Sequence, residues 1–160
     1  MQIKQGYVYH IKNEYFEVVK ADKLMKNHEG NYTRPNYFCF KNENEKFMWF
    51  IPMSSQVEKY RIIIKDKIKK HGRCDTIIIG KYRKRQTAFL LQNMFPITEK
   101  YIDHIDVVNN KPVPVVVGTQ KEIENKVKVL FKLKKRGINL IFPDVDRIKE
   151  LLLKELETNL

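Results

Sequence analysis

The sequence predicts an α+β protein: a compact antiparallel sheet, arranged as a partly open barrel, with about four helices packed around it. Two kinds of segment lead to this class. Short apolar stretches with the two-residue period of a strand occur as hairpins, and longer stretches carry apolar residues at the spacing of a helix. The 160 residues, 42% of them hydrophobic, contain no repeat and no Gly/Ser linker, so residues 1–160 are expected to form a single domain.

The chain begins with a strand and a helix. Residues 6–11 alternate like a short strand, and Asn13 can cap a helix that extends to about Met25. The inner side of this helix is expected to consist of Tyr15, Val18, Val19 and Leu24. Residues 27–35 are typical of a turn.

A hairpin follows, and it is the clearest local signal in the chain. Residues 36–41 and 46–51 have the pattern of paired strands, with the polar residues 42–45 as the turn between them. Since residues 46–51 are apolar on both faces, this strand is expected to lie at the centre of the sheet.

The middle of the chain predicts a helix and a second hairpin. Residues 55–70 carry one apolar stripe, and Gly72 ends the helix. The stripe consists of Val57, Tyr60, Ile64 and Ile68. Strands at 76–79 and 87–91 then enclose a basic hairpin tip at 80–85.

Two helices complete the chain, after an apolar strand end at 93–97 and a possible last strand at 115–117. The first helix covers residues 119–136, and the second opens at 143–144. The capping box and the stop residue of the first helix are Thr119, Glu122 and Gly137.

The composition is strongly basic, with 31 Lys and Arg against 19 Asp and Glu and a formal net charge of +12. A surplus of this size on a small domain indicates a polyanionic partner. Nucleic acid is the first candidate and an anionic membrane surface is the second. A basic surface without a specific partner is the remaining alternative.

The sequence favours a cytoplasmic location. The amino-terminal residues lack the apolar core of a signal peptide, and no apolar run reaches the roughly 18–20 residues of a membrane-spanning helix. Cys39 and Cys74 lie far apart in strand-like stretches, as expected of two buried thiols in a reducing compartment.

Metal and cofactor chemistry is not indicated by the sequence. Asp144 and Asp146 lie at one helix start, where capping accounts for them, and no Cys/His spacing suits zinc. The histidines show no pairing in sequence, and each is expected to be structural or on the surface: His10, His28, His71 and His104. We therefore expect no metal ion and no cofactor.

A loop with two hydroxyls, Pro52-Met53-Ser54-Ser55, leads from the central strand into the helix predicted at 55–70. The amino end of a helix offers free amides and positive partial charge, which suit a phosphate. RNA cleavage needs no metal, because the 2′-hydroxyl is an internal nucleophile that hydroxyls, a cation and amides can assist. The alternative is a capping box of Ser55 and Glu58, and the spacing taken alone favours this capping box over a phosphate site.

Three groups of basic residues are candidates for RNA binding. The hairpin tip carries Lys81, Arg83, Lys84 and Arg85. The two longest predicted helices carry Lys65 and Lys69, and Lys121, Lys128, Lys132 and Lys135. A charged helix face is usually only solvated, but charges of one sign favour a groove that follows a phosphate backbone. Nearby tyrosines are candidates for stacking on unpaired bases, namely Tyr7, Tyr9, Tyr32, Tyr37 and Tyr82.

The order of several short motifs resembles the ToxN/AbiQ toxins of type III toxin–antitoxin systems. In those toxins a Tyr three residues before a Pro precedes a strand pair and a Pro-apolar-hydroxyl-Ser turn, as residues 31–38 and 51–55 do here. Residues 93–97 resemble the family's second strand-end motif. The resemblance covers about residues 5–100, and the CptN branch is the most similar, given the short chain.

This resemblance implies a metal-independent endoribonuclease with a fold related to the MazF/Kid barrel, which cuts RNA to 2′,3′-cyclic phosphate and 5′-hydroxyl ends. It implies messenger RNA as the target and a role in phage defence. It also implies inhibition by a small structured antitoxin RNA, pseudoknotted and made as tandem repeats that the toxin trims. Toxin and RNA are then expected to assemble into a closed, alternating complex.

The family's site residues carry over by position. Ser55 matches the catalytic serine, Ser54 its hydroxyl neighbour and Tyr32 the active-site tyrosine. The resemblance therefore places the chemistry at residues 52–55, directly before the helix predicted at 55–70.

Two lysines of the family pattern are absent here. Asn36 follows the Pro, and Val57 stands two residues after the Ser, where the family often has Lys. We expect Arg34 or Lys59 to supply the cationic role instead. The sequence does not identify the general base.

Two other functions stay open at this point. A non-catalytic RNA-binding module needs only the positive charge of the chain. A MazF-like ribonuclease neutralised by a protein antitoxin would share the expected fold.

Overall fold

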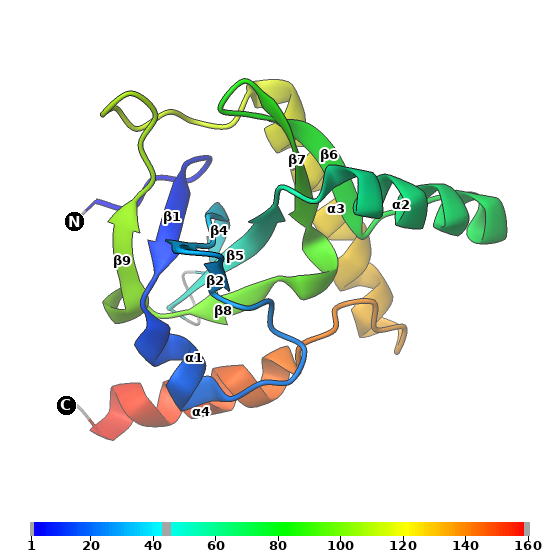
Figure 1. Ribbon diagram of the computed structural model, residues 1–160. Coiled ribbons are helices and arrows are strands. Elements are labelled where there is room, and N and C mark those ends of the chain that lie inside the picture. The colour runs from blue at the N-terminus through cyan, green and yellow to red at the C-terminus, as the bar shows by residue number, and fades with distance from the viewer. Residues whose placement is uncertain (1, 43–45, 159–160) are drawn as a thin grey trace.

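The computed structural model describes residues 2–42 and 46–158 and has the predicted α+β class (Figure 1). Four helices occur in the described part: α1 (Asn13–Val19), α2 (Val57–His71), α3 (Val117–Lys135) and α4 (Val145–Thr158). The strands are β1 (Val8–Ile11), β2 (His28–Glu29), β3 (Tyr32–Thr33), β4 (Asn36–Asn42), β5 (Phe47–Ser54), β6 (Ile77–Tyr82), β7 (Arg85–Leu90), β8 (Phe95–Ile97) and β9 (Ile102–Ile105). Of the turn predicted at 42–45, Asn42 ends β4 and the other three residues lie outside the described residues.

The main sheet is antiparallel and unclosed, with the strand order β6-β7-β5-β4-β1-β9 and with β8 paired to β5. β5 is its centre, as predicted, because it pairs with β4, β7 and β8 and is buried along its whole length. β6 and β9 are the two ends of the order, so the sheet stays open between them. The short pair β2–β3 forms a separate hairpin.

Helices cover the sheet and create its core clusters. The cluster beneath α3 includes Ile51, Met53, Phe89, Ile123 and Leu130. The cluster beneath α1 and α4 includes Tyr9, Phe50, Phe95, Tyr15 and Ile148. A smaller cluster ties α2 to β6 and β7 through Tyr60, Cys74, Ile77, Ala88 and Leu90. Both cysteines are buried and free, as predicted.

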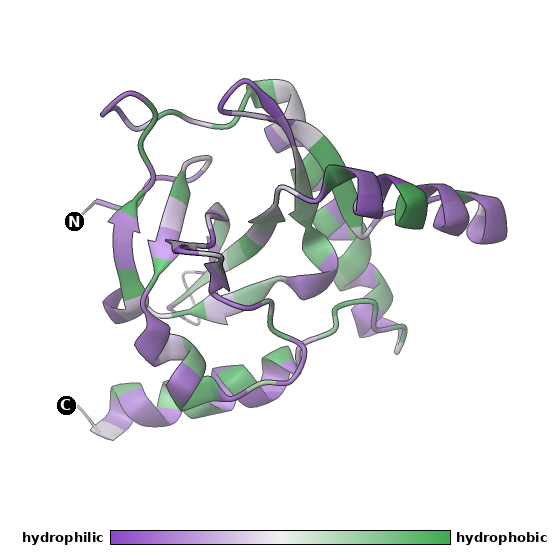
Figure 2. Cartoon of the chain, in the orientation of Figure 1, coloured by the Kyte–Doolittle hydropathy of each residue, from purple (hydrophilic) through white to green (hydrophobic). Residues whose placement is uncertain are grey.

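The helix α2 projects from the body of the molecule, and Figure 2 shows it as largely hydrophilic. Its predicted stripe packs at one end only. Tyr60 is buried and Ile64 half-buried, whereas Ile68 near the far end is 48% exposed. No helix in the described part of the chain is long and apolar enough to cross a membrane.

The start of α3 differs from the prediction. The helix begins at Val117 behind Val116, which provides no side-chain cap, so the capping box of Thr119 and Glu122 is wrong. Thr119 instead packs beside Gly80, where an added Cβ would lie 2.8 Å from its methyl group. The strand predicted at residues 115–117 is absent, because α3 already begins at Val117. The predicted stop is confirmed, because Gly137 has a positive φ and donates its amide to Lys134.

Helix α1 is shorter than predicted. It ends at Val19, because Lys20 adopts the left-handed conformation and donates its amide to the Phe16 carbonyl. Tyr15 and Val19 are buried as expected, and Leu24 still packs on the same core beyond the helix. Val18 is 38% exposed and does not belong to the inner side. The strands β2, β3 and β9 were not predicted.

Candidate active site

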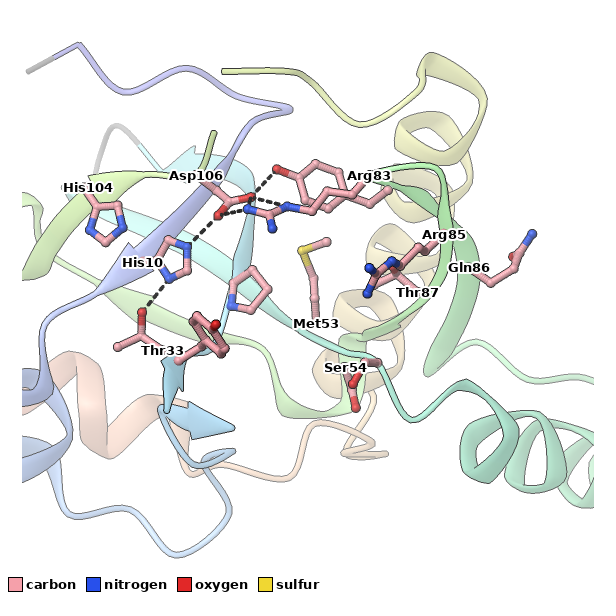
Figure 3. Close-up of a pocket in the computed structure, with 14 residues that line it drawn as sticks. His10, Thr33, Met53, Ser54, Arg83, Arg85, Gln86, Thr87, His104 and Asp106 are labelled. Atoms are coloured by element: carbon pink, nitrogen blue, oxygen red, sulfur yellow. Dashed lines mark hydrogen bonds and ion pairs between the residues drawn. The ribbon is translucent and has the colours of Figure 1, made fainter. Parts of the chain in front are cut away.

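A cavity of about 440 Å³ opens between the two ends of the sheet (Figure 3). Its walls come from β1, β3, the end of β5, the β6–β7 hairpin and the segment after β9. Most of the lining is polar or charged, including His10, Tyr32, Thr33, Ser54, Ser55, Tyr82, Arg83, Arg85, His104 and Asp106. The cavity therefore brings together hydroxyls, imidazoles, guanidiniums and one carboxylate from distant parts of the sequence.

The serine segment, residues 52–55, forms one wall of this cavity. Its prediction as a loop is wrong for Pro52, Met53 and Ser54, because β5 continues to Ser54 through pairing with β4 and β7. Ser54 ends β5 and is buried, and its Oγ accepts a hydrogen bond of 3.1 Å from the amide of Gln56. Ser55 is exposed and also lines the cavity. The predicted capping box of Ser55 and Glu58 is wrong, because α2 begins at Val57 and its first turn has no side-chain cap. The hydroxyls predicted for the site therefore lie in the cavity, while the first turn of α2 does not line it.

The β2–β3 hairpin brings Tyr32 and Thr33 to the cavity. Tyr32 is 80% exposed at the rim, unlike most of the other tyrosines considered for stacking. Tyr9, Tyr37 and Tyr82 are buried in the core, and Tyr7 is half-buried. Tyr32 is thus the tyrosine of that group whose ring is open to a ligand.

Asp106 links the two open ends of the sheet. Its carboxylate accepts hydrogen bonds from Tyr82 at 2.6 Å and from Arg83 at 2.7, 2.8 and 3.1 Å. On its other side His10 Nε2 lies 2.7 Å from Oδ1. Burial alone would raise the pKa of Asp106, but the hydrogen bonds from His10, Tyr82 and Arg83 outweigh it and lower the pKa to about 2. Burial, followed by the bond to Asp106, raises the pKa of Tyr82 far above its usual value.

The histidines of this cavity are paired, which the sequence did not indicate. His10 on β1 lies opposite His104 on β9, and their rings stack with centroids 4.4 Å apart and planes 10° from parallel. The Nδ1 atom of His10 lies 2.7 Å from the hydroxyl of Thr33. Only the pairing of β1 with β9 creates this group, and β9 was not predicted.

The two cations expected at the serine loop do not line the cavity. Arg34 is buried, and its guanidinium donates to the carbonyls of Lys26 at 2.7 Å and Met53 at 2.9 Å. It therefore supports the strand that carries Ser54. Lys59 lies on α2 beside the ring of Tyr60. The cations that do line the cavity are Arg83, held by Asp106, and Arg85.

The other basic candidates lie on exposed surfaces. Lys81 and Lys84 are exposed on the β6–β7 hairpin, Lys65 and Lys69 on α2, and Lys121 on α3. Lys128, Lys132 and Lys135 rim a second groove of about 390 Å³. Its floor includes the half-buried rings of Phe40 and Phe131, which meet edge to face at 5.9 Å.

Comparison with known proteins identifies the fold. No family model and no curated protein matches the sequence. Among solved structures, the chain is similar to AbiQ, a lactococcal anti-phage endoribonuclease of a type III toxin–antitoxin system, with a TM-score of 0.67. The match covers 98% of both chains at 16% identity. The fold expected from the resemblance to the ToxN/AbiQ toxins is thus confirmed over nearly the whole chain.

Proposed function

We propose that this protein is an endoribonuclease toxin of a type III toxin–antitoxin system. One observation carries the proposal. Tyr32, Ser54 and Ser55, which match the family's site by position, meet in one cavity of a chain that has the fold of AbiQ. The pairing of β4 with β5 sets Asn36 opposite Pro52 and so brings the tyrosine motif beside the serines, and all three side chains line the same cavity.

The chemistry assigned to this cavity is internal transesterification. The 2′-hydroxyl of the substrate attacks the neighbouring phosphorus, and the P–O5′ bond breaks to give a 2′,3′-cyclic phosphate and a 5′-hydroxyl. Ser55, with Ser54 beside it, positions the phosphate by hydrogen bonds. Arg85 stabilises the charge that develops on the phosphate oxygens, since it lines the cavity and the described residues include no ion-pair partner for it. Such a site needs no metal ion.

Arg85 thus takes the cationic role that the sequence assigned to Arg34 or Lys59, neither of which lines the cavity. The guanidinium of Arg34 contacts the Met53 carbonyl, so we assign it to positioning the strand before Ser54. Lys59, outside the lining, is assigned to contacts with more distant phosphates. Tyr32 is assigned to stacking on a base beside the scissile phosphate, because its ring is exposed at the rim.

The RNA path is proposed to continue over the basic surfaces. The β6–β7 hairpin extends from the cavity with Lys81 and Lys84 exposed. The groove on α3 combines three lysines with the rings of Phe40 and Phe131, a combination that suits a phosphate backbone and one unpaired base. The lysines of α2, Lys65 and Lys69, are assigned to phosphate contacts of the same kind.

The proposed partner is a small antitoxin RNA, cut from tandem repeats by the toxin and folded as a pseudoknot. It binds the same basic surfaces as the target messenger RNA and assembles with the toxin into a closed complex in the cytoplasm. The DNA upstream of the gene tests this partner directly. Short tandem repeats support an RNA antitoxin, whereas a small open reading frame favours a MazF-like toxin neutralised by a protein.

The cleavage activity is tested by incubating purified protein with RNA in EDTA and identifying the fragment ends. Fragments with 2′,3′-cyclic phosphates are expected. Intact RNA that is bound in a salt-dependent way would contradict the proposal and favour a non-catalytic RNA-binding module.

The serine assignment is tested by Ser55→Ala in cells and in the cleavage assay. We expect toxicity and cleavage to be lost, while binding of the antitoxin RNA is largely kept. Thr158→Ala removes a hydroxyl on α4 outside the cavity and is the matched control. A fully toxic Ser55→Ala protein would contradict the assignment.

A further inference from the structure

Three side chains form a continuous hydrogen-bonded chain along one wall of the cavity: Asp106, His10 and Thr33 (Figure 3). Both links are 2.7 Å long, from the carboxylate to Nε2 and from Nδ1 to the hydroxyl. The residues come from three separate segments, and all of them line the cavity. Asp106 and His10 are buried, while Thr33 is half-buried.

The direction of these hydrogen bonds follows from the state of Asp106. With its pKa lowered to about 2, the carboxyl is ionised near neutral pH and only accepts. The proton of a neutral His10 ring therefore sits on Nε2, and its Nδ1 lone pair faces the Thr33 hydroxyl. That order, carboxylate, imidazole and hydroxyl, is the order found where an imidazole activates a hydroxyl.

We propose that Thr33, His10 and Asp106 are the proton relay of the RNA-cleaving site. The inference rests on the proposed function and supplies its general base. As the 2′-oxygen bonds to phosphorus, its proton passes to the Thr33 oxygen while the Thr33 proton passes to His10 Nδ1. The 5′-oxygen leaves with the electron pair of the P–O bond and takes a proton from water. The hydroxide formed then removes the extra proton from His10.

The position of the relay suits this role. Figure 3 shows His10, Thr33 and Asp106 on one side of the cavity and Ser54, Arg85 and Thr87 on the other. A phosphate between the two sides would meet the relay on one flank and hydroxyl and guanidinium donors on the other.

Thr33 is not needed to hold the two open ends of the sheet together. Tyr82 and Arg83 already hold Asp106 to the β6–β7 hairpin. The link from His10 to a hydroxyl at the cavity surface adds nothing to that tie, but it completes a path for a proton.

Several charged and titratable groups surround the His10 ring. Asp106 contacts it directly, and Tyr82 and Arg83 act through that carboxylate. From β9 the ring of His104 stacks on it, and Asp103 accepts a hydrogen bond from His104.

The relay is tested by single-turnover cleavage of an oligoribonucleotide in EDTA from pH 5 to 8.5. Wild-type cleavage is expected to rise with pH and then level off, because the relay needs a neutral imidazole. Thr33→Val, which replaces the hydroxyl with a methyl group, should lower the rate by about 100-fold or more, whereas Thr33→Ser should keep most of the wild-type rate. RNA affinity should stay unchanged in both variants.

His10→Gln should show a similar loss of rate, and its pH profile should have no rising limb. His71→Gln, on the exposed end of α2, should keep the wild-type rate and the rising limb. A merely structural His10 would alter the melting temperature and leave the shape of the pH profile intact. Equal rates for the wild type and Thr33→Val, or a rising limb in His10→Gln, would overturn the relay alone. A wild-type protein that leaves RNA intact would overturn the proposed function as well.

Discussion

Replacing Asp106 by asparagine tests how the open ends of the sheet are held together. The carboxylate is buried and accepts hydrogen bonds from His10, Tyr82 and Arg83. These bonds lower its pKa from the usual 3.8 to about 2, and one pKa unit corresponds to about 1.36 kcal/mol. The ionised carboxylate therefore stabilises the folded state by about 2 kcal/mol relative to its protonated form.

The sign of the pH effect follows from the lowered pKa. The stabilisation is fully present above about pH 4 and is lost as the pH falls through about 2. Because asparagine resembles the protonated carboxyl, Asp106→Asn should lose about 2 kcal/mol of unfolding free energy at pH 7. The difference from the wild type should shrink steadily at acidic pH.

Urea unfolding between pH 7 and pH 2 measures this difference, with Asp103→Asn as the matched control. Asp103 is exposed and pairs with His104 at the surface, so its variant should stay within about 0.5 kcal/mol of the wild type. Equal stability of Asp106→Asn and the wild type at pH 7 would show that the ionised carboxylate does not stabilise the fold. A difference in stability that stays constant down to pH 2 would show that the effect of the substitution does not come from the ionisation of Asp106.

Three further predictions concern the surface of the molecule. Tyr32→Ala should leave stability unchanged and lower kcat/KM on RNA by about tenfold, whereas Tyr32→Phe keeps the stacking ring and the activity. Lys132→Glu combined with Lys135→Glu should weaken RNA binding and reduce the slope of log Kd against log salt by roughly 2, as measured by fluorescence titration. Lys84→Gly should raise the free energy of unfolding by roughly 0.5 kcal/mol, seen as a slightly higher melting temperature, because Lys84 has a φ of 59° in a two-residue turn.

Local periodicity was enough to predict the central strand of the sheet and the end of the longest helix. Residues 46–51 are apolar on both faces because β5 has neighbours on both sides and is covered above and below. Gly137 stops α3 because a left-handed residue is needed there. The serine loop was found for the same kind of reason, since it lies where a strand gives way to a helix.

The parts that the sequence did not reveal depend on contacts between distant residues. β9 has two exposed residues at its centre, Asp103 and His104, so it shows no apolar alternation. The relay group exists only because β9 pairs with β1 and carries the chain on to Asp106. Arg34 stands next to the motif in sequence, but nothing local shows that its guanidinium is buried against backbone carbonyls.

Whether this cavity cuts RNA through the 2′-hydroxyl can be measured at the scissile bond itself. An oligoribonucleotide is first cut in EDTA to map one scissile bond, and the nucleotide before that bond is then made 2′-deoxy. We expect cleavage at that bond to disappear and the unmodified control to carry a 2′,3′-cyclic phosphate, identified by mass spectrometry. Cleavage that persists at the deoxy position, or an unmodified control that is never cut, would show that the cavity does not cut RNA through the 2′-hydroxyl.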